Sequence, residues 1–192
     1  MQYTLEVILQ DYKPKNWREI VVSWDKTFEE LCNIIISLYW LDKDHLWEYR
    51  IGDDFFINSP EFGDIDDKTI DKFEDKKFGD LQWLSLNHNG GKYKLHEHFS
   101  SDKNYKNAVL YYDFWDNRVF DVKLKSSKDT DQWSDREVID GDGYYLISDI
   151  GGVEWLNELV EEYKKKTINP DLFESREDFE EYIKPALKKF SI

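Results

Sequence analysis

The first 60 residues place two pairs of strand-like segments on either side of one amphipathic segment. Residues 3–9 and 17–24 are rich in β-branched and aromatic side chains, and residues 46–51 and 55–58 follow the same pattern. Residues 27–41 between the two pairs have the apolar spacing of a helix instead. This order predicts an α+β fold in which a helix packs on one face of an antiparallel or mixed sheet, in a β-grasp-like arrangement.

The beginning of the predicted helix is marked by its capping residues. Thr27 can cap the first turn, and Glu30 stands three residues later, where its carboxylate can accept from the backbone N–H of Thr27. Leu31, Ile35 and Leu38 then recur on one stripe of the helix surface. We therefore expect this helix to bury one face against the strands.

The middle of the chain predicts a second hairpin. Residues 109–114 and 118–124 read as strands joined by the turn at residues 115–117. A short strand is expected at residues 93–95. The polar, acidic residues 129–142 are expected to form a loop.

The C-terminal part is predicted to be helical. Gly151 and Gly152 precede an amphipathic segment, and Ser175 can cap a last helix that Pro185 should kink or divide. We expect residues 1–166 to form one α+β domain and residues 167–192 a C-terminal helical extension.

Composition restricts the class of protein. The chain has 192 residues and a net charge of −15, without a long basic segment, so direct nucleic-acid binding is not expected. Eight Trp, twelve Tyr and twelve Phe can build a packed core. Cys32 is the only cysteine, which excludes an intramolecular disulfide. The N-terminal residues lack a secretory pattern and no apolar run could span a bilayer, so a cytoplasmic protein without membrane association is expected.

Several short motifs recur in a fixed order. The pattern Lys-Pro-x-x-Trp-Arg lies at residues 13–18, and an aromatic followed by His-Leu-x-x-Tyr lies within residues 40–49. Tyr-Asp-Phe-x-Asp stands at residues 112–116, and Asp-Ile-Gly-Gly at residues 149–152. Over residues 3–163, this order and spacing resemble the plasmid pRiA ORF-three-like family.

The chain departs from the family pattern near its central motif. Trp115 stands where the family has glycine, and Arg118 where it has tryptophan. Leu146-Ile147-Ser148 replaces the Cys-Pro-Pro segment of the family. The activity of the family is not assigned, so no catalytic residue or cofactor is carried over. The resemblance implies a non-enzymatic interaction module linked to mobile genetic elements.

The best polar cluster in the sequence combines His45 with Asp113 and Asp116. Carboxylates and an imidazole could hold a divalent cation or perform acid–base chemistry, whereas aspartates in a turn often only shape its backbone. Trp115 belongs to a turn, where a large apolar side chain suggests a contact with a partner. The candidate binding residues are Trp17, Arg18, His45, Tyr112, Asp113, Trp115 and Asp116.

Three functions remain open at this point. The first is an interaction module with a protein partner, including basic or nucleic-acid-binding proteins. The second is an inhibitor whose acidic segments, residues 52–80 and 129–142, imitate nucleic-acid phosphates. The third is a metal-assisted hydrolase based on His45, Asp113 and Asp116. His96 and His98 would share one face if they lay on a strand, but a packed pair is favoured over a zinc site there.

Overall fold

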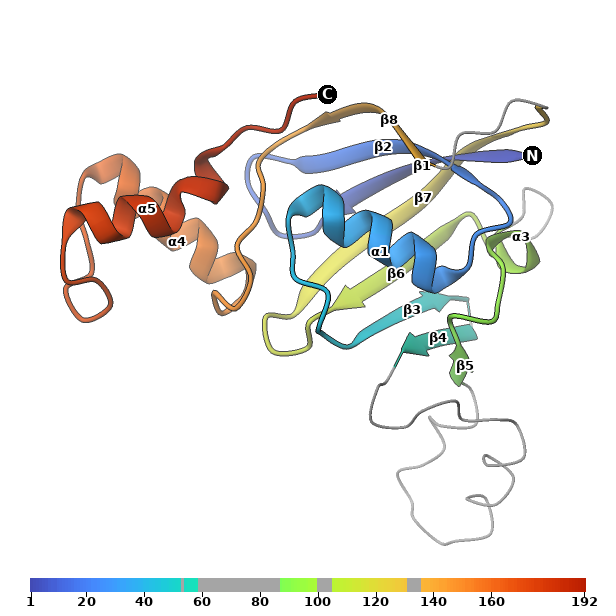
Figure 1. Ribbon diagram of the computed structural model, residues 1–192, viewed down its shortest axis with the longest axis horizontal. Coiled ribbons are helices and arrows are strands. Elements are labelled where there is room, and N and C mark those ends of the chain that lie inside the picture. The colour runs from blue at the N-terminus through green and yellow to red at the C-terminus, as the bar shows by residue number, and fades with distance from the viewer. Residues whose placement is uncertain (53, 59–86, 100–104, 131–135) are drawn as a thin grey trace, which may run out of the picture.

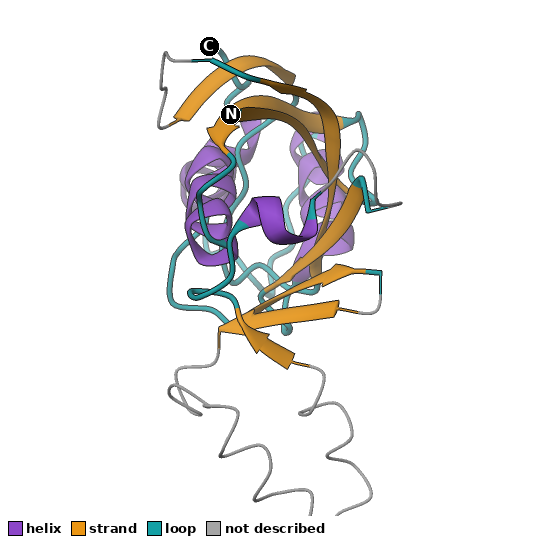
Figure 2. Ribbon diagram, turned by 90° about the vertical axis from the view of Figure 1, so that its right-hand side faces the viewer, coloured by secondary structure: helices purple, strands orange, loops and turns teal. Residues whose placement is uncertain are grey.

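Eight strands form one sheet that is strongly curved (Figures 1 and 2). The computed structural model describes residues 1–52, 54–58, 87–99, 105–130 and 136–192. The strands are β1 (Gln2–Leu9), β2 (Asn16–Ser23), β3 (Trp47–Ile51), β4 (Asp54–Asn58), β5 (Asn87–Asn89), β6 (Asn107–Tyr112), β7 (Arg118–Lys128) and β8 (Arg136–Asp142). The described helices are α1 (Phe28–Tyr39), α3 (Leu95–His98), α4 (Gly152–Lys165) and α5 (Arg176–Leu187). The predicted α+β class is therefore confirmed.

The strand order in the sheet is β5-β4-β3-β6-β7-β1-β2-β8. All neighbouring strands pair antiparallel except β4 and β5, which are parallel. The hairpin β1–β2, the following helix and the later strands correspond to the expected order of elements. The sheet differs from a β-grasp sheet in the pairing of its first strand. Here β1 lies between β2 and β7 and is antiparallel to both.

Side chains alternate between a buried and a partly exposed face along the central strands. In β1, Tyr3, Leu5, Val7 and Leu9 are buried, and the residues between them are only partly covered. Irregular pairing between β1 and β7 and between β2 and β8 interrupts the ladders, and such bulges increase local twist and bending. The curved sheet can thus cover α1, which crosses one of its faces (Figure 1).

Helix α1 follows the capping prediction closely. The Glu30 N–H donates to the Thr27 hydroxyl, and the Thr27 N–H donates to the Glu30 carboxylate at 2.8 Å. Leu31 and Ile35 are fully buried, as is the apolar face around them. Trp40 ends the helix in the left-handed conformation, with a φ of 62°.

Two segments differ from their predicted structure. Residues 136–142 form the edge strand β8 instead of a loop, since their backbone pairs with β2 although Val138 and Ile139 are their only apolar side chains. Residues 93–95 were expected to be a strand, but only Lys94 makes an isolated bridge, to Thr27, and Leu95 already begins helix α3. The missing apolar alternation in residues 136–142 explains the first error.

The C-terminal residues return to the sheet after the two helices. Ser175 caps α5, as predicted, and Pro185 lies inside its last turns. The N–H of Phe190 donates to the carbonyl oxygen of Gly143 at 2.8 Å, and Tyr145 donates to Lys188. These bonds attach the tail to the segment between β8 and α4. In the described part of the chain, no helix is long and apolar enough to cross a membrane.

Candidate functional site

The turn between β6 and β7 is held by the side chain of Asp113. One carboxylate oxygen of Asp113 accepts from the backbone N–H groups of Trp115 and Asp116 at 3.2 and 3.3 Å. The backbone N–H of Asp113 donates to the carbonyl oxygen of Leu46. Asp113 and Asn117 have φ values of 55° and 46°, which aspartate and asparagine tolerate better than most residues. Hydrogen bonds within the turn therefore fix its shape, and the bond to Leu46 attaches it to the loop before β3.

Asp116 connects this turn to the beginning of α4. Its carboxylate accepts from the backbone N–H groups of Ile150 at 3.1 Å and Gly151 at 2.7 Å. An anionic group suits this position, because the N-terminal end of a helix carries partial positive charge. Gly152 lies so close that an added Cβ would stand 2.6 Å from the carbonyl oxygen of Asp116. The Asp-Ile-Gly-Gly motif is thus the partner of the central motif.

Arg118 neutralises Asp116 inside the protein. The Arg118 side chain is fully buried, and its Nη2 donates to Asp116 at 2.6 Å and also to the carbonyl oxygen of Ile147. Its Nε and Nη1 have no hydrogen-bond partner among the described residues. Breaking a buried pair of this kind leaves an uncompensated charge, which is strongly destabilising. The contact therefore secures three separate segments at one end of the sheet.

His45 lies between two carboxylates next to the same turn. Its Nδ1 is 3.5 Å from Asp113, and its Nε2 is 3.7 Å from Asp149. The ring also meets the ring of Tyr112 edge-on, at a centroid distance of 5.8 Å. Tyr112 is buried and donates its hydroxyl to the carbonyl oxygen of Asp42, and burial raises the pKa of that hydroxyl.

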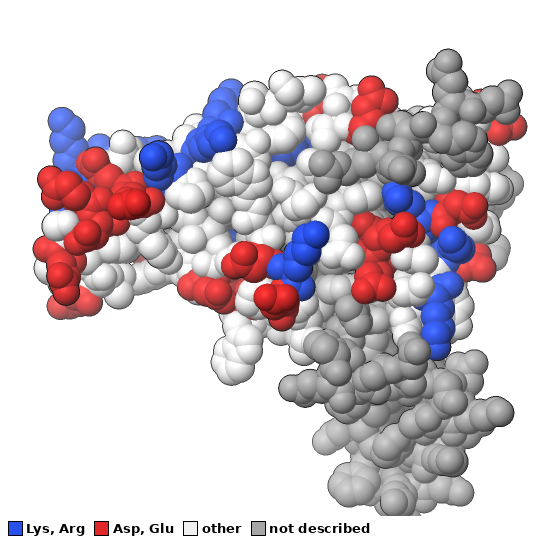
Figure 3. All heavy atoms as spheres, viewed as in Figure 1, with Lys and Arg blue, Asp and Glu red and all other residues white. Residues whose placement is uncertain are grey.

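The outer side of the turn presents aromatic side chains to solvent. Trp115 is 96% exposed and Phe114 is 52% exposed, in contrast to the buried aspartates on either side of them. Asp42, Asp44 and Asp149 are exposed in the two loops that contact the turn. Figure 3 shows acidic side chains gathered on the face beside the β6–β7 turn. The turn therefore combines an apolar tip with mainly acidic surroundings, although Lys43 is also exposed between Asp42 and Asp44.

Trp17 and Arg18 lie at a different place, on β2. The Arg18 guanidinium is fully buried between the rings of Tyr39 and Phe190, whose centroids are 4.5 and 3.8 Å away. It donates to the carbonyl oxygens of Trp17, Asp142 and Tyr144. Burial lowers the pKa of Arg18. This arginine joins β2 to β8 and to the C-terminal tail.

The structure thus brings together four of the seven residues predicted to bind. His45, Tyr112, Asp113 and Asp116 lie around the turn, while Trp115 points outward from it and Trp17 and Arg18 lie two strands away. Asp116 cannot serve the predicted hydrolase cluster freely, because both of its oxygens already accept hydrogen bonds.

The prediction missed Asp149 as a member of the cluster and Arg118 as the partner of Asp116. The sequence signal for Asp149 is its place in the Asp-Ile-Gly-Gly motif, but the motif does not show which residues it contacts.

The two histidines His96 and His98 do not form a shared site in the structure. His96 and His98 lie on helix α3, not on a strand; His96 Nδ1 is 3.2 Å from the carbonyl oxygen of Trp24, and His98 Nδ1 is 3.1 Å from Asp54. They therefore contact separate neighbours, as expected for packed histidines. Most of the acidic segment 52–80, and residues 131–135 of the segment 129–142, lie outside the described residues.

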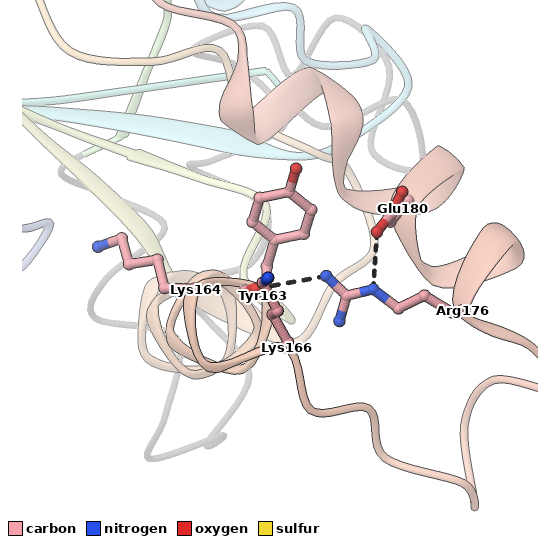
Figure 4. Close-up of a pocket in the computed structure, with 5 residues that line it drawn as sticks. All are labelled: Tyr163, Lys164, Lys166, Arg176 and Glu180. Carbon is pink, nitrogen blue, oxygen red and sulfur yellow. Dashed lines mark hydrogen bonds and ion pairs between the residues drawn. The ribbon is translucent and has the colours of Figure 1, made fainter.

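A surface cavity of about 550 Å³ lies between α4 and α5 (Figure 4). Arg176 lines it, but its guanidinium donates to Glu180 and to the carbonyl oxygens of Tyr163 and Thr167. Lys164 also lines it and pairs with Glu161 at 2.8 Å. The charged groups of Arg176 and Lys164 are thus bonded to neighbouring parts of α4 and α5 instead of being available to a ligand. For this reason we do not take the cavity as the candidate site.

Comparison with known proteins identifies the family and a shared fold. The chain matches the family model described as plasmid pRiA4b ORF-3-like protein over residues 1–190, and it therefore belongs to that family. A crystal structure of MM3350, a protein of unknown function from Methanosarcina mazei Go1, superposes with a TM-score of 0.68 at 21% identity. The match covers 95% of this chain and 88% of MM3350, and it shows a shared fold. No curated protein matches the chain.

Proposed function

We propose that the protein is a non-enzymatic interaction module that binds a protein partner through the β6–β7 turn. The observation that carries the proposal is Trp115, which is 96% exposed at the tip of a turn secured by buried hydrogen bonds. Burying a large apolar side chain contributes roughly 1.5–3 kcal/mol, and tryptophan is enriched among residues that dominate binding energy. A rigid turn loses little conformational freedom when it binds.

The surroundings of Trp115 define the chemistry of the partner. Asp42, Asp44 and Asp149 are exposed in the neighbouring loops, and the chain as a whole carries a net charge of −15. A partner with an apolar pocket and a basic rim would complement this surface. Phosphate groups would be repelled, so nucleic acid itself is not the proposed ligand. The family is named after a plasmid reading frame, which supports a role connected to mobile elements.

The test is a capture experiment from host lysate with three forms of the full chain as bait. Wild-type protein should retain a stoichiometric partner, and Trp115→Ala should retain much less of it. Leu172→Ala serves as the control, because Leu172 is an apolar residue that is 50% exposed but lies between α4 and α5, away from the β6–β7 turn in the sequence. Release of the partner by added salt would support a contribution from the acidic residues around Trp115, because salt screens exposed charges. Equal retention of every captured protein by all three baits would contradict the proposal.

A further inference from the structure

The structure assigns a second site, directly beneath the exposed turn: His45, Asp113 and Asp149 form a binding site for one divalent transition-metal ion. One potential ligand atom from each of these residues lies within 4.8 Å of the other two. The three residues come from three segments: the loop before β3, the β6–β7 turn and the loop that leads into α4. Metal binding here requires no partner at Trp115, although Asp149 belongs both to this site and to the acidic surroundings of the turn.

The separations fit a small metal ion. In a tetrahedral zinc site, bonds of about 2.0–2.2 Å place neighbouring ligand atoms roughly 3.3–3.6 Å apart. One nitrogen of His45 and one oxygen from each aspartate lie within 4.8 Å of one another. The contacts of 3.5 Å to Asp113 and 3.7 Å to Asp149 involve Nδ1 and Nε2 respectively, of which only one can ligate a given ion. Both separations are long for direct hydrogen bonds, so His45 is not firmly bonded to either carboxylate. Small side-chain movements would bring the three groups into the range of coordination.

The burial of Asp113 is a separate observation that points to a cationic ligand. Its side chain is 3% exposed, yet within the described ranges no lysine or arginine pairs with it. Arg118, the nearby buried cation, is already paired with Asp116 at 2.6 Å. A buried carboxylate normally has a charged partner or coordinates a metal. His45 stands next to Asp113, and neutral imidazole is a common metal ligand.

The residue types indicate which metals the site would select. One imidazole and two carboxylates suit zinc or manganese, whereas magnesium and calcium prefer oxygen ligands alone. The Asp149 side chain is 75% exposed, so solvent can complete the coordination sphere. The buried ligand is held in place by the backbone N–H groups of Trp115 and Asp116, which donate to the Asp113 carboxylate. Such outer contacts orient the ligands of metal sites.

The experiment is a calorimetric titration of the untagged, EDTA-treated full chain with Zn²⁺, Mn²⁺ and Mg²⁺. We expect one equivalent of Zn²⁺ or Mn²⁺ to bind, with weaker binding of Mg²⁺. Asp149→Asn and His45→Gln should each weaken binding by about tenfold or more. His96→Gln is the control, because His96 lies on α3 and is close to a different carboxylate, that of Asp25.

Thermal unfolding distinguishes a lost site from a lost fold. Asp149 is exposed, so Asp149→Asn should keep the wild-type melting temperature in EDTA but lose the rise that Zn²⁺ gives the wild-type protein. The proposal is overturned if neither Zn²⁺ nor Mn²⁺ binds the wild type at a defined stoichiometry. It is also overturned if Asp149→Asn binds as tightly as the wild type, or if His96→Gln loses binding to the same extent.

Discussion

At the scale of single residues, the protein buries two arginines at the same end of the sheet in different ways. Arg118 has a carboxylate partner, Asp116, while Arg18 is surrounded by backbone carbonyl oxygens and two aromatic rings. Arg118 connects β7 to the segment before α4, and Arg18 connects β2 to the segment after β8. Both side chains therefore attach the C-terminal third of the chain to the sheet.

The Asp116–Arg118 pair gives a sharp test of this view. Replacing the carboxylate by an amide, Asp116→Asn, should lower the free energy of unfolding by about 3–5 kcal/mol, because Arg118 keeps a buried charge without compensation. The double variant Asp116→Asn/Arg118→Met should be more stable than the sum of the two single changes predicts. Urea denaturation of all four proteins measures this coupling. Strict additivity would show that the pair contributes no mutual stabilisation.

Individual residues of the site were only partly predictable. The resemblance and the turn chemistry identified Asp113 and Asp116, since aspartates next to a hairpin turn are a local signal. The partners Arg118 and Asp149 depend on tertiary contacts: Asp149 lies 3.7 Å from His45, a residue more than a hundred positions earlier. No local pattern reports such a contact. The exposure of Trp115 follows from its place in a turn, where a large apolar residue has few neighbours to pack against, while its role in binding stays a prediction.

At the scale of elements, the central strand β1 is stabilised on its less buried face by charge pairs. The Glu6 carboxylate accepts from Lys15 on the β1–β2 connection at 3.0 Å, and Lys125 on β7 lies 3.8 Å away. Partial burial raises the pKa of Glu6, but the hydrogen bond from Lys15 and the charges of Lys125 and Lys123 together lower it below its ordinary value. The ionised form is therefore favoured in the folded protein.

This depressed pKa predicts a pH dependence of stability. A carboxylate with a lowered folded-state pKa stabilises the protein above its unfolded pKa, about 4.3 for glutamate, and loses this effect as pH falls through the folded value. Glu6→Gln should therefore be less stable than the wild type near neutral pH, and the difference should shrink in acid. Urea denaturation of both proteins over this pH range measures it. A difference that stays constant or grows in acid would contradict the assignment.

Elements with strong local signals were predicted well, and those defined by pairing were not. Helix α1 has both a capping box and an apolar stripe, so its beginning follows from Thr27 and Glu30. Strand β8 has neither apolar alternation nor many β-branched residues, and it exists because β2 offers a free edge. Lys94 likewise has extended backbone, but only long enough for one bridge before α3 begins.

At the scale of the whole molecule, one core joins the sheet, α1 and the C-terminal helices. The buried cluster includes Leu5 and Phe120 from the sheet, Cys32 and Ile35 from α1, and Phe179 from α5. In the C-terminal tail, the ring of Phe190 packs against the guanidinium of Arg18. The expected helical extension after residue 166 is thus in contact with the sheet domain through its last residues.

The single cysteine provides a direct probe of this common core. Cys32 is 1% exposed, and burial raises the pKa of its thiol well above its ordinary value. Because the thiolate is the reactive form, iodoacetamide should label Cys32 only when the protein unfolds. The urea midpoint of labelling should coincide with the midpoint of tryptophan fluorescence. Rapid labelling without urea would show that α1 opens independently of the sheet.

The most direct test of the account measures affinity and stability on the same variant. With the captured partner purified, Trp115→Ala should weaken its dissociation constant by at least about tenfold, as expected for a residue that dominates an interface. The free energy of unfolding should stay within about 0.5 kcal/mol of the wild type, because Trp115 is 96% exposed. An unchanged dissociation constant, or a loss of several kcal/mol of stability, would contradict the claim that the turn exists to present Trp115.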